Sequence, residues 1–301
     1  MPKVSVLIPS FNCAQYLPEA LDSVLKQTFK DFEAIIIDDG STDNTKEIVR
    51  KYVEREPEKI RYIYQENQGL ACARNTGLRQ ARGSLIALLD ADDLSLPQRL
   101  EETVRAIEAD EEVGLVHANI TRITEDGSVI GILKRNPRFL TGNIFNYIYL
   151  RKADISIPTI LFRKECCERV GLFDENLARL GCEDRELWLR ISRHYKFKYI
   201  DKVLGLYRVR SNSMSRNTEK MMEARIYVIE KFCSLYKDCQ RLRKKALAKI
   251  YRDLGDQFLS EHEFNNSREQ YAKAIVLNPI SIWPWINYIK ALLRLQTSKE
   301  F

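Results

Sequence analysis

The sequence predicts an α/β fold, in which a mostly parallel sheet is flanked by helices and followed by a C-terminal α-helical extension. Over the first hundred residues, short apolar runs alternate with amphipathic segments of helical length. Continuous apolar runs are typical of parallel strands that are buried on both faces. After the polar stretch 211–217 the pattern becomes purely helical. The 301 residues, 45% of them hydrophobic, provide enough apolar material for a large core and exclude a disordered chain.

In residues 1–97, each apolar run is expected to be a strand and each amphipathic segment a helix. The expected strands are 4–8, 32–37, 60–64 and 85–89. The expected helices are 16–27, 42–55 and 70–81. Repeated βαβ units of this kind bind ligands beyond the carboxyl ends of their strands, so residues 1–97 are interpreted as a nucleotide-binding half.

In residues 98–215 the alternation of predicted strands and helices becomes less regular, and we interpret this part as the acceptor half of the same domain. Here we expect strands at 114–118 and 155–162, a strand pair or bend over 197–207, helices at 97–110, 164–170 and 183–194, and a hairpin around 125–127. Residues 1–215 therefore form the predicted catalytic domain, and residues 216–301 a separate helical segment.

The helical segment contains one stretch with the spacing of a tetratricopeptide unit, over residues 248–281. The matching side chains are Tyr251, Leu254, Gly255, Phe258, Tyr271, Ala274 and Pro279. Because about three such repeats are normally needed for independent stability, we expect this segment to dock on the catalytic domain, a second copy or another protein. For Trp283, Trp285, Ile286 and Ile289, core packing is favoured over a docking or membrane-facing role.

The positive charge is confined to the helical segment. The formal net charge is +6, yet residues 1–215 carry equal numbers of basic and acidic side chains, 32 of each. The basic run 241–252 is interpreted as a solvated helix face, with contact to anionic lipid headgroups as the alternative hypothesis. Residues 1–215 have no basic footprint for nucleic acid.

The cysteine and hydropathy patterns predict a cytoplasmic protein, or one peripheral at the inner face of the membrane. The seven cysteines form no CxxC pair, and the three histidines have no zinc-ligand spacing. No apolar run approaches the roughly 20 residues that span a bilayer, and the N-terminal run is too short for a signal peptide.

Acidic residues follow two of the predicted strands. Asp38 and Asp39 end one of them, where a carboxylate could bind a base or ribose, or where the pair could simply form a turn and helix cap. Asp90, Asp92 and Asp93 follow another. Three carboxylates this close repel one another unless a cation neutralises them, and oxygen ligands favour Mg²⁺ or Mn²⁺. The alternative is a solvated acidic loop.

Two predicted helices begin with residues that could carry chemistry, and the first of them begins near the same sheet edge. Residues 69–77 open one of them, where backbone N–H groups and Arg74 could meet a diphosphate. Glu183 and Asp184 open the other, and their favourable interaction with the helix dipole would explain them without any function. Neither a Walker-type GxxxxGK nor GxGxxG occurs, which disfavours an NTPase or a dinucleotide oxidoreductase.

Taken together, these segments resemble the family 2 inverting glycosyltransferases, which have a GT-A fold. The matching stretches are 4–12, 37–43, 69–77, the Asp90–Asp93 version of the DxD motif, and 181–184. They lie in the order found in that family and cover about residues 3–215.

The resemblance implies a role for each matching residue. Pro9 and Asp39 would line the nucleotide base, and Arg74 would lie near the base and the phosphates. Asp90 would lie near the ribose or a metal-bound water, and Asp92 would bind the divalent cation, Mn²⁺ or Mg²⁺.

In the same comparison, Asp184 would be the general base, and Glu183 would belong to the nucleotide-sugar site. The stretch 207–213 departs from the Tyr-Arg-x-His-x-x-Ser pattern of many family members, because Arg210 stands where they have the histidine. A guanidinium stays protonated and offers no metal-binding lone pair, so Arg210 is expected to contact the diphosphate instead.

The implied function is a metal-dependent inverting transfer of a sugar from a UDP- or dTDP-sugar to a hydroxyl of a saccharide, lipid-linked or protein acceptor, in polysaccharide or glycoconjugate synthesis. The alternative is a catalytically silent nucleotide-sugar-binding or scaffold subunit with a helical interaction tail. Retention of Asp184 and of the DxD motif speaks against that alternative. The donor sugar, the acceptor and the linkage depend on the pocket shape in residues 95–215.

Overall fold

The computed structural model describes residues 1–133, 137, 140–211, 213–214 and 217–294. The chain divides into two compact units, of which the first comprises residues 1–148 and 153–213 and the second residues 149–152 and those from 214 onward. The predicted domain boundary at residues 215 and 216 lies outside the described residues. We describe each unit separately.

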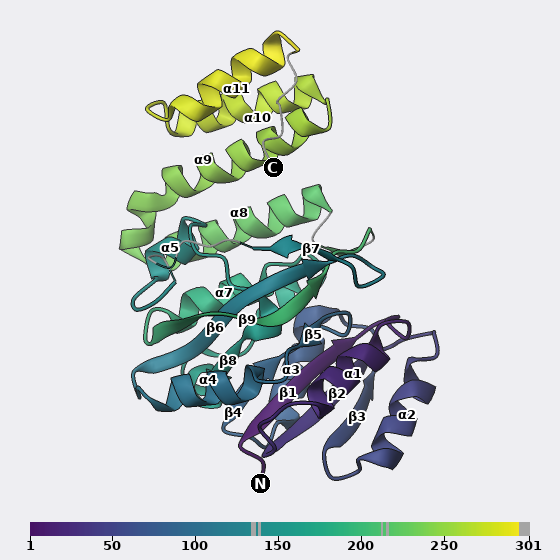
Figure 1. The fold of residues 1–301 in the computed structure, drawn as a ribbon. Coiled ribbons are helices and arrows are strands. Elements are labelled where there is room, and N and C mark those ends of the chain that lie inside the picture. Colours follow the sequence, from purple (N-terminus) through teal and green to yellow (C-terminus); the bar gives the residue numbers. More distant parts are fainter. Residues whose placement is uncertain (134–136, 138–139, 212, 215–216, 295–301) are drawn as a thin grey trace. The chain divides into compact units, whose positions relative to one another are not determined.

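The first unit is built on a sheet to which the described residues contribute nine strands, in the order β3-β2-β1-β4-β8-β6-β9-β5 with β7 beside β6 (Figure 1). The strands are β1 Val4–Ser10, β2 Phe32–Asp39, β3 Ile60–Gln65, β4 Leu85–Leu88, β5 Leu94–Ser95, β6 Val113–Ile123, β7 Val129–Ile132, β8 Leu161–Arg163 and β9 Lys196–Arg208. Strands β1 to β4 are parallel to one another, as predicted, so their carboxyl ends lie at one edge of the sheet.

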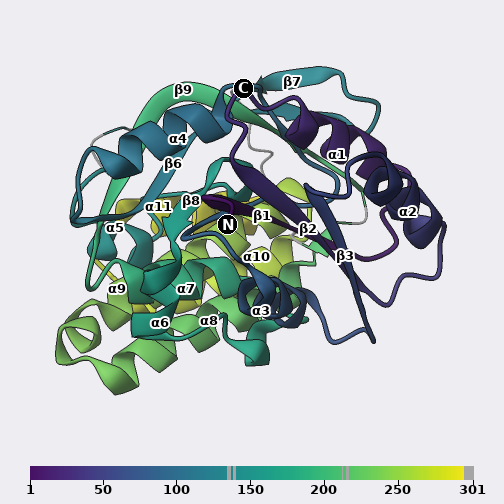
Figure 2. The ribbon, with the colours of Figure 1, turned by 90° about the horizontal axis from the view of Figure 1, so that it is seen from below.

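Helices cover both faces of this sheet. They are α1 Leu17–Leu25, α2 Thr45–Arg55, α3 Leu70–Gln80, α4 Arg99–Glu108, α5 Phe145–Tyr149, α6 Lys164–Val170 and α7 Glu183–Ile191. Figure 2 shows α1, α2 and α4 on one face and α3, α6 and α7 on the other. Because side chains alternate along a strand, Val6 of β1 joins the core under α1, whereas Leu7 faces α3.

The packing of α3 against the sheet depends on a glycine. A Cβ atom at Gly77 would lie 2.8 Å from Cδ1 of Ile37 and 3.2 Å from Cδ1 of Leu7. The missing side chain lets α3 approach the sheet closely, which fixes the position of Arg74 one turn earlier.

The second half of the sheet is mixed. Strand β8 is antiparallel to both β4 and β6, whereas β6 and β9 are parallel. The prediction of a strand over 155–162 is wrong: residues Ile157–Thr159 form a 3₁₀ turn and β8 begins only at Leu161. Pro158 has no N–H to donate, and the Thr159 hydroxyl takes the place of a ladder partner by bonding to the backbone N–H and C=O of Ala118.

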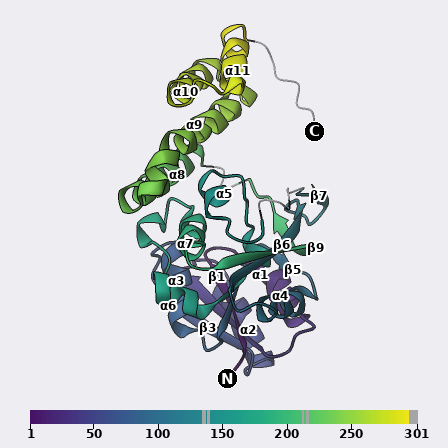
Figure 3. The same cartoon turned by 90° about the vertical axis from the view of Figure 1, so that its left-hand side faces the viewer.

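The second unit contains the helices α8 Thr218–Leu235, α9 Lys237–Ser260, α10 Phe264–Leu277 and α11 Ile282–Leu292 (Figure 3). Helices α9 and α10 pack closely at Gly255, where a Cβ atom would lie 2.8 Å from the ring of Tyr271. The hydroxyl of Ser267 donates to the Gly255 carbonyl oxygen over 2.9 Å.

Within the described residues, no helix combines the length and apolar character needed to cross a bilayer. The expectation of core packing at one face is wrong, because all four of its residues are exposed: Trp283, Trp285, Ile286 and Ile289.

Candidate active site

The polar residues predicted to carry chemistry gather beyond the carboxyl ends of β1, β2 and β4. Pro9 lies buried in β1, in register with Ile37 of β2, and Asp39 is the last residue of β2. Asp90 follows β4 by two residues. The amino-terminal parts of α3 and α7 complete the edge, because Arg74 of α3 pairs with both Asp90 and Glu183, the first residue of α7.

Asp39 organises the segment that leads into α3. Its Oδ1 accepts hydrogen bonds from Gln65 Nε2 at 2.7 Å and from the backbone N–H of Gln68 at 3.0 Å, and its Oδ2 accepts one from the N–H of Gly69 at 2.8 Å. The neighbouring Asp38 accepts from the hydroxyl of Tyr62 at 2.6 Å. Both carboxylates are therefore buried and hydrogen-bonded, and Oδ2 of Asp39 keeps capacity for a further donor.

Arg74 connects three elements through its guanidinium. Nη2 donates to Asp90 Oδ1 over 2.7 Å, Nη1 donates to Glu183 Oε1, and the group lies 5.7 Å from the centre of the Phe173 ring. The Arg74 side chain is fully buried, so its partners are carboxylates rather than a solvent-facing ligand. A contact between Arg74 and the base or phosphates stays a prediction, and the structure gives the residue a positioning role that sequence spacing does not reveal.

The two acidic residues that open α7 have different surroundings. Positive φ angles at Gly181 and Cys182 turn the chain into the helix. Burial raises the pKa of the Glu183 carboxyl to about 7, against the opposing effect of Arg74. Asp184 is only partly buried, yet desolvation still raises its pKa while Arg74 and Arg185 lower it. A carboxylate that is partly accessible and has a raised pKa can accept a proton.

Arg210 pairs with Asp92, the central residue of the acidic cluster that Asp90, Asp92 and Asp93 form. Its Nη1 lies 2.9 Å from Asp92 Oδ2 and donates to Cys13 Sγ over 3.5 Å. The guanidinium also lies 4.8 Å from the centre of the Tyr16 ring. Burial and the charge of Asp90 raise the pKa of Asp92, and Arg210 partly offsets this rise. Arg210 thus supplies positive charge where the acidic cluster needs it.

Asp93 and Arg208 form a further interaction that sequence reasoning missed. The backbone N–H of Arg208 donates to Asp93 Oδ1 over 2.8 Å, and the guanidinium donates to the Asp92 carbonyl oxygen and to Glu19 Oε2, each over 2.9 Å. Burial, followed by the charges of Asp92 and Asp90, raises the pKa of Asp93. The arginines at 208 and 210, separated by one residue, are the only hint of this arrangement in the sequence.

The acidic cluster fits a divalent cation that is held largely by its substrate. The described residues contain no group of three His, Cys, Asp or Glu side chains arranged to hold a metal by themselves. Magnesium usually binds one or two carboxylates together with substrate phosphates and waters, so such a group is not required. Asp93 Oδ2 is buried without a hydrogen-bond partner, and Asp92 is partly exposed beside Asp90. Asp90 and Asp92 are already paired with Arg74 and Arg210, so a cation would use their remaining oxygens together with substrate phosphates.

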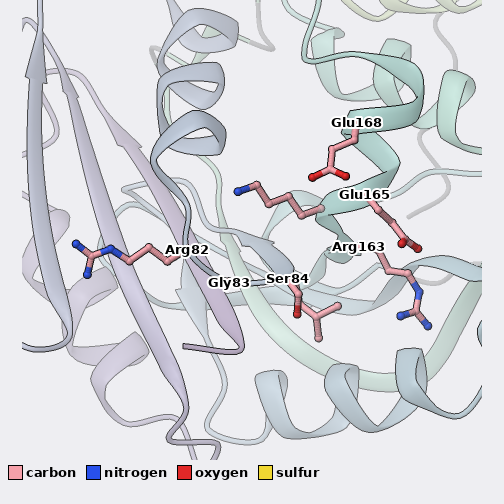
Figure 4. Close-up of a pocket in the computed structure, with 8 residues that line it drawn as sticks. Arg82, Gly83, Ser84, Arg163, Glu165 and Glu168 are labelled. Atoms are coloured by element: carbon pink, nitrogen blue, oxygen red, sulfur yellow. The ribbon is translucent and has the colours of Figure 1, made fainter. Parts of the chain in front are cut away.

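A cavity of about 290 Å³ lies elsewhere, beside the amino end of β4 and the start of α6 (Figure 4). Figure 4 shows Arg82 pointing away from Glu165 and Glu168. The guanidinium of Arg163 is bonded to backbone carbonyl oxygens, among them that of Val113 at 2.9 Å. This cavity lies at the amino end of β4, whereas Asp39 and Asp90 lie at the carboxyl ends of the strands. We therefore place the candidate active site at the cluster of polar side chains and not at this cavity.

Comparison with known proteins identifies the class of this site. The Glycosyl transferase family 2 profile matches residues 5–171, more than half of the chain. The chain belongs to glycosyltransferase family 2 and has a GT-A fold.

One relative and two solved structures illustrate the similarity. An uncharacterized glycosyltransferase of Rickettsia felis is 37% identical over 207 residues, which cover 69% of this chain and 33% of the relative. The chain thus spans about one third of the length of the first curated relatives it matches.

The structure of S. aureus TarS 1-349 in complex with UDP-GlcNAc has a TM-score of 0.67 and 20% identity, covering 97% of this chain and 88% of that one. The mannosyltransferase PcManGT from Pyrobaculum calidifontis, in complex with GDP-Man and Mn²⁺, has a TM-score of 0.65 and 22% identity, covering 97% and 80%. These two structures are similar to this chain in fold.

Proposed function

We propose that this protein is an inverting glycosyltransferase that transfers a sugar from a UDP- or dTDP-sugar to an acceptor hydroxyl, with a divalent cation as cofactor. The observation that carries the proposal is the double ion pair of Arg74. By binding Asp90 and Glu183 together, this buried side chain links the donor-side acidic cluster to the helix that carries Asp184.

In this proposal Asp184 is the general base. It accepts the proton of the acceptor hydroxyl while that oxygen bonds to the anomeric carbon and the bond from that carbon to the diphosphate oxygen breaks. One displacement inverts the anomeric configuration. The raised pKa of Asp184 supports this role, because a base is most effective when its pKa approaches the working pH.

The nucleotide-sugar donor would lie beyond the carboxyl ends of β1, β2 and β4. Pro9 and Asp39 would line the base, and the remaining acceptor capacity of Asp39 Oδ2 suits a pyrimidine N–H. Asp92, with Asp90 nearby, would hold the cation, which when bound neutralises charge on the departing diphosphate. Arg210 would bind the diphosphate, because its guanidinium already lies at the acidic cluster. The acceptor would be a saccharide, a lipid-linked glycan or a protein.

The decisive experiment replaces Asp184 with asparagine. A general base typically contributes 10²- to 10⁴-fold, so we expect Asp184→Asn to lower transfer by at least about 100-fold while binding of the nucleotide-sugar is nearly unchanged. The matched control is Asp31→Asn, the same change at the amino end of β2, which should keep full activity. Donors are first screened for Mn²⁺-dependent hydrolysis and thermal stabilisation. Full transfer by a folded Asp184→Asn protein would exclude this residue as the base.

The alternative, a silent nucleotide-sugar-binding subunit, makes a different prediction in the same screen. Such a protein would be stabilised by a donor but would neither transfer nor hydrolyse it with any cation. Turnover of one donor by the wild type, and its loss in Asp184→Asn, therefore separates the two functions.

A further inference from the structure

Helix α11 of the second unit has its apolar side outward. Its buried residues are Pro284, Asn287 and Ala291, whereas its large aliphatic and aromatic side chains are exposed. We call these side chains, with their neighbours at the α10–α11 connection, the apolar stripe: Ile280, Ile282, Trp285, Ile286, Ile289, Leu292 and Leu293, each between 44% and 89% exposed. Exposed apolar groups that recur at helical spacing indicate a binding surface.

A basic cavity lies in the same unit. It has a volume of about 200 Å³, and its lining includes the cations of Lys152, Lys245, Lys249 and Arg252 and no acidic side chain. We call it the basic pocket. Lys249 Nζ donates to the Arg151 carbonyl oxygen over 2.6 Å, which holds the ammonium beside the cavity. Arg252 is already paired with Asp253 over 2.6 Å. Several cationic side chains around one small cavity suit a phosphate group.

The two features meet at the α10–α11 connection. Ser281 and Pro284 line the basic pocket, and the exposed Ile280 and Ile282 flank Ser281 in the chain. The indole Nε1 of Trp285 donates to the Pro279 carbonyl oxygen over 3.0 Å, so this ring lies along the same connection. The basic pocket and the apolar stripe therefore adjoin at this connection, where Pro284 lines the pocket from the buried side of α11 and the stripe covers the exposed side.

We propose that the helical unit binds the surface of an anionic membrane, with a lipid phosphate in the basic pocket and the apolar stripe in the boundary between headgroups and acyl chains. The apolar stripe and the basic pocket fit this boundary, because amphipathic helices bind anionic membranes through apolar area together with basic side chains. The excess of 16 basic over 10 acidic residues in 216–301 adds a longer-range attraction. This inference does not depend on the proposed transfer reaction.

The test uses the full-length chain and sedimentation with vesicles. We expect binding to phosphatidylcholine vesicles that contain phosphatidylglycerol, and little binding to phosphatidylcholine alone. Lys245→Glu should lower the partition coefficient roughly tenfold or more, since each basic residue near the surface contributes about 1 kcal/mol. Lys244→Glu is the matched control, because it changes the same charge on the neighbouring residue of α9, which does not line the pocket. Equal binding by the two variants would overturn the proposal.

The apolar stripe has its own matched pair. Ile289→Ser should weaken vesicle binding, whereas Leu235→Ser, at an exposed leucine at the end of α8, should not. If Ile289→Ser instead dissociates a dimer seen by light scattering without vesicles, the stripe is a contact between copies and the membrane proposal is wrong. It is also wrong if inorganic phosphate stabilises the wild type but not Lys245→Glu while vesicles do not bind, because the pocket then serves a soluble phosphate.

Discussion

Replacing Arg74 with methionine removes the single cation that holds Asp90 and Glu183. Breaking a buried ion pair by deleting one partner costs about 3–5 kcal/mol, because the other charge stays buried. The Glu183 side chain is only 5% exposed and would bear most of this cost, whereas Asp90, at 27%, can be hydrated again. We therefore expect a loss near the lower limit, about 3 kcal/mol in the free energy of unfolding.

Fluorescence of Trp188 provides the measurement. This buried residue of α7 is the tryptophan of the first unit, and the other two of the three, Trp283 and Trp285, lie in the second. In a background with both of those changed to phenylalanine, urea unfolding followed at Trp188 reports on the first unit.

The double variant Arg74→Met/Glu183→Gln removes both charges of the buried pair. It should be less destabilised than the two single variants together, by about 1–3 kcal/mol. The pH dependence has a definite sign: without Arg74 the pKa of Glu183 rises further above the usual 4.5, so the stability of Arg74→Met falls as pH increases through that raised pKa. An unchanged unfolding free energy, or strict additivity in the double variant, would refute this account.

Three further predictions concern catalysis and packing. The kcat/KM of transfer should fall as pH decreases through the raised pKa of Asp184, at a pH above the usual 3.8 of an aspartate, and an acidic limb that persists in Asp184→Asn would contradict this. Arg210→Ala should weaken UDP binding about tenfold in calorimetry, the loss expected for a charge-assisted hydrogen bond, and an unchanged Kd would exclude the diphosphate contact. Gly77→Ala should destabilise the first unit by about 1–3 kcal/mol in urea titrations, because the new methyl group meets Ile37 and Leu7, despite the better helix propensity of alanine.

The sequence predicted best what depends on short-range pattern. Apart from the two-residue strand β5, the strands and helices of residues 1–97 follow from hydrophobic periodicity, and the hairpin around Gly127 follows from turn chemistry. The strand predicted over 155–162 was wrong because tertiary hydrogen bonding at Thr159 outweighed the apolar run. The exposure of Trp285 was also missed, since periodicity identifies an apolar face without saying what covers it.

The sequence proposed the members of the candidate site but not their connections. The motifs indicated that Asp39, Asp90 and Asp92 lie near the strand ends and that Asp184 opens a helix. That Arg74 contacts Glu183, 109 positions away, depends on how α3 and α7 are placed in three dimensions, which no local pattern encodes. The buried state of Asp93 depends in the same way on the end of β9.

The second unit is not one continuous piece of chain. Residues 149–152 belong to it, and they are held there by the Tyr149 hydroxyl against Cys233 Sγ at 3.0 Å and by the ion pair of Arg151 with Asp253 at 3.1 Å. A single cut after Ser213 therefore releases neither unit intact: one fragment loses its four-residue insert, and the other keeps a tyrosine and an arginine without their partners. Truncated, chimeric or fused forms of this protein therefore have to keep residues 149–152 together with the C-terminal helices.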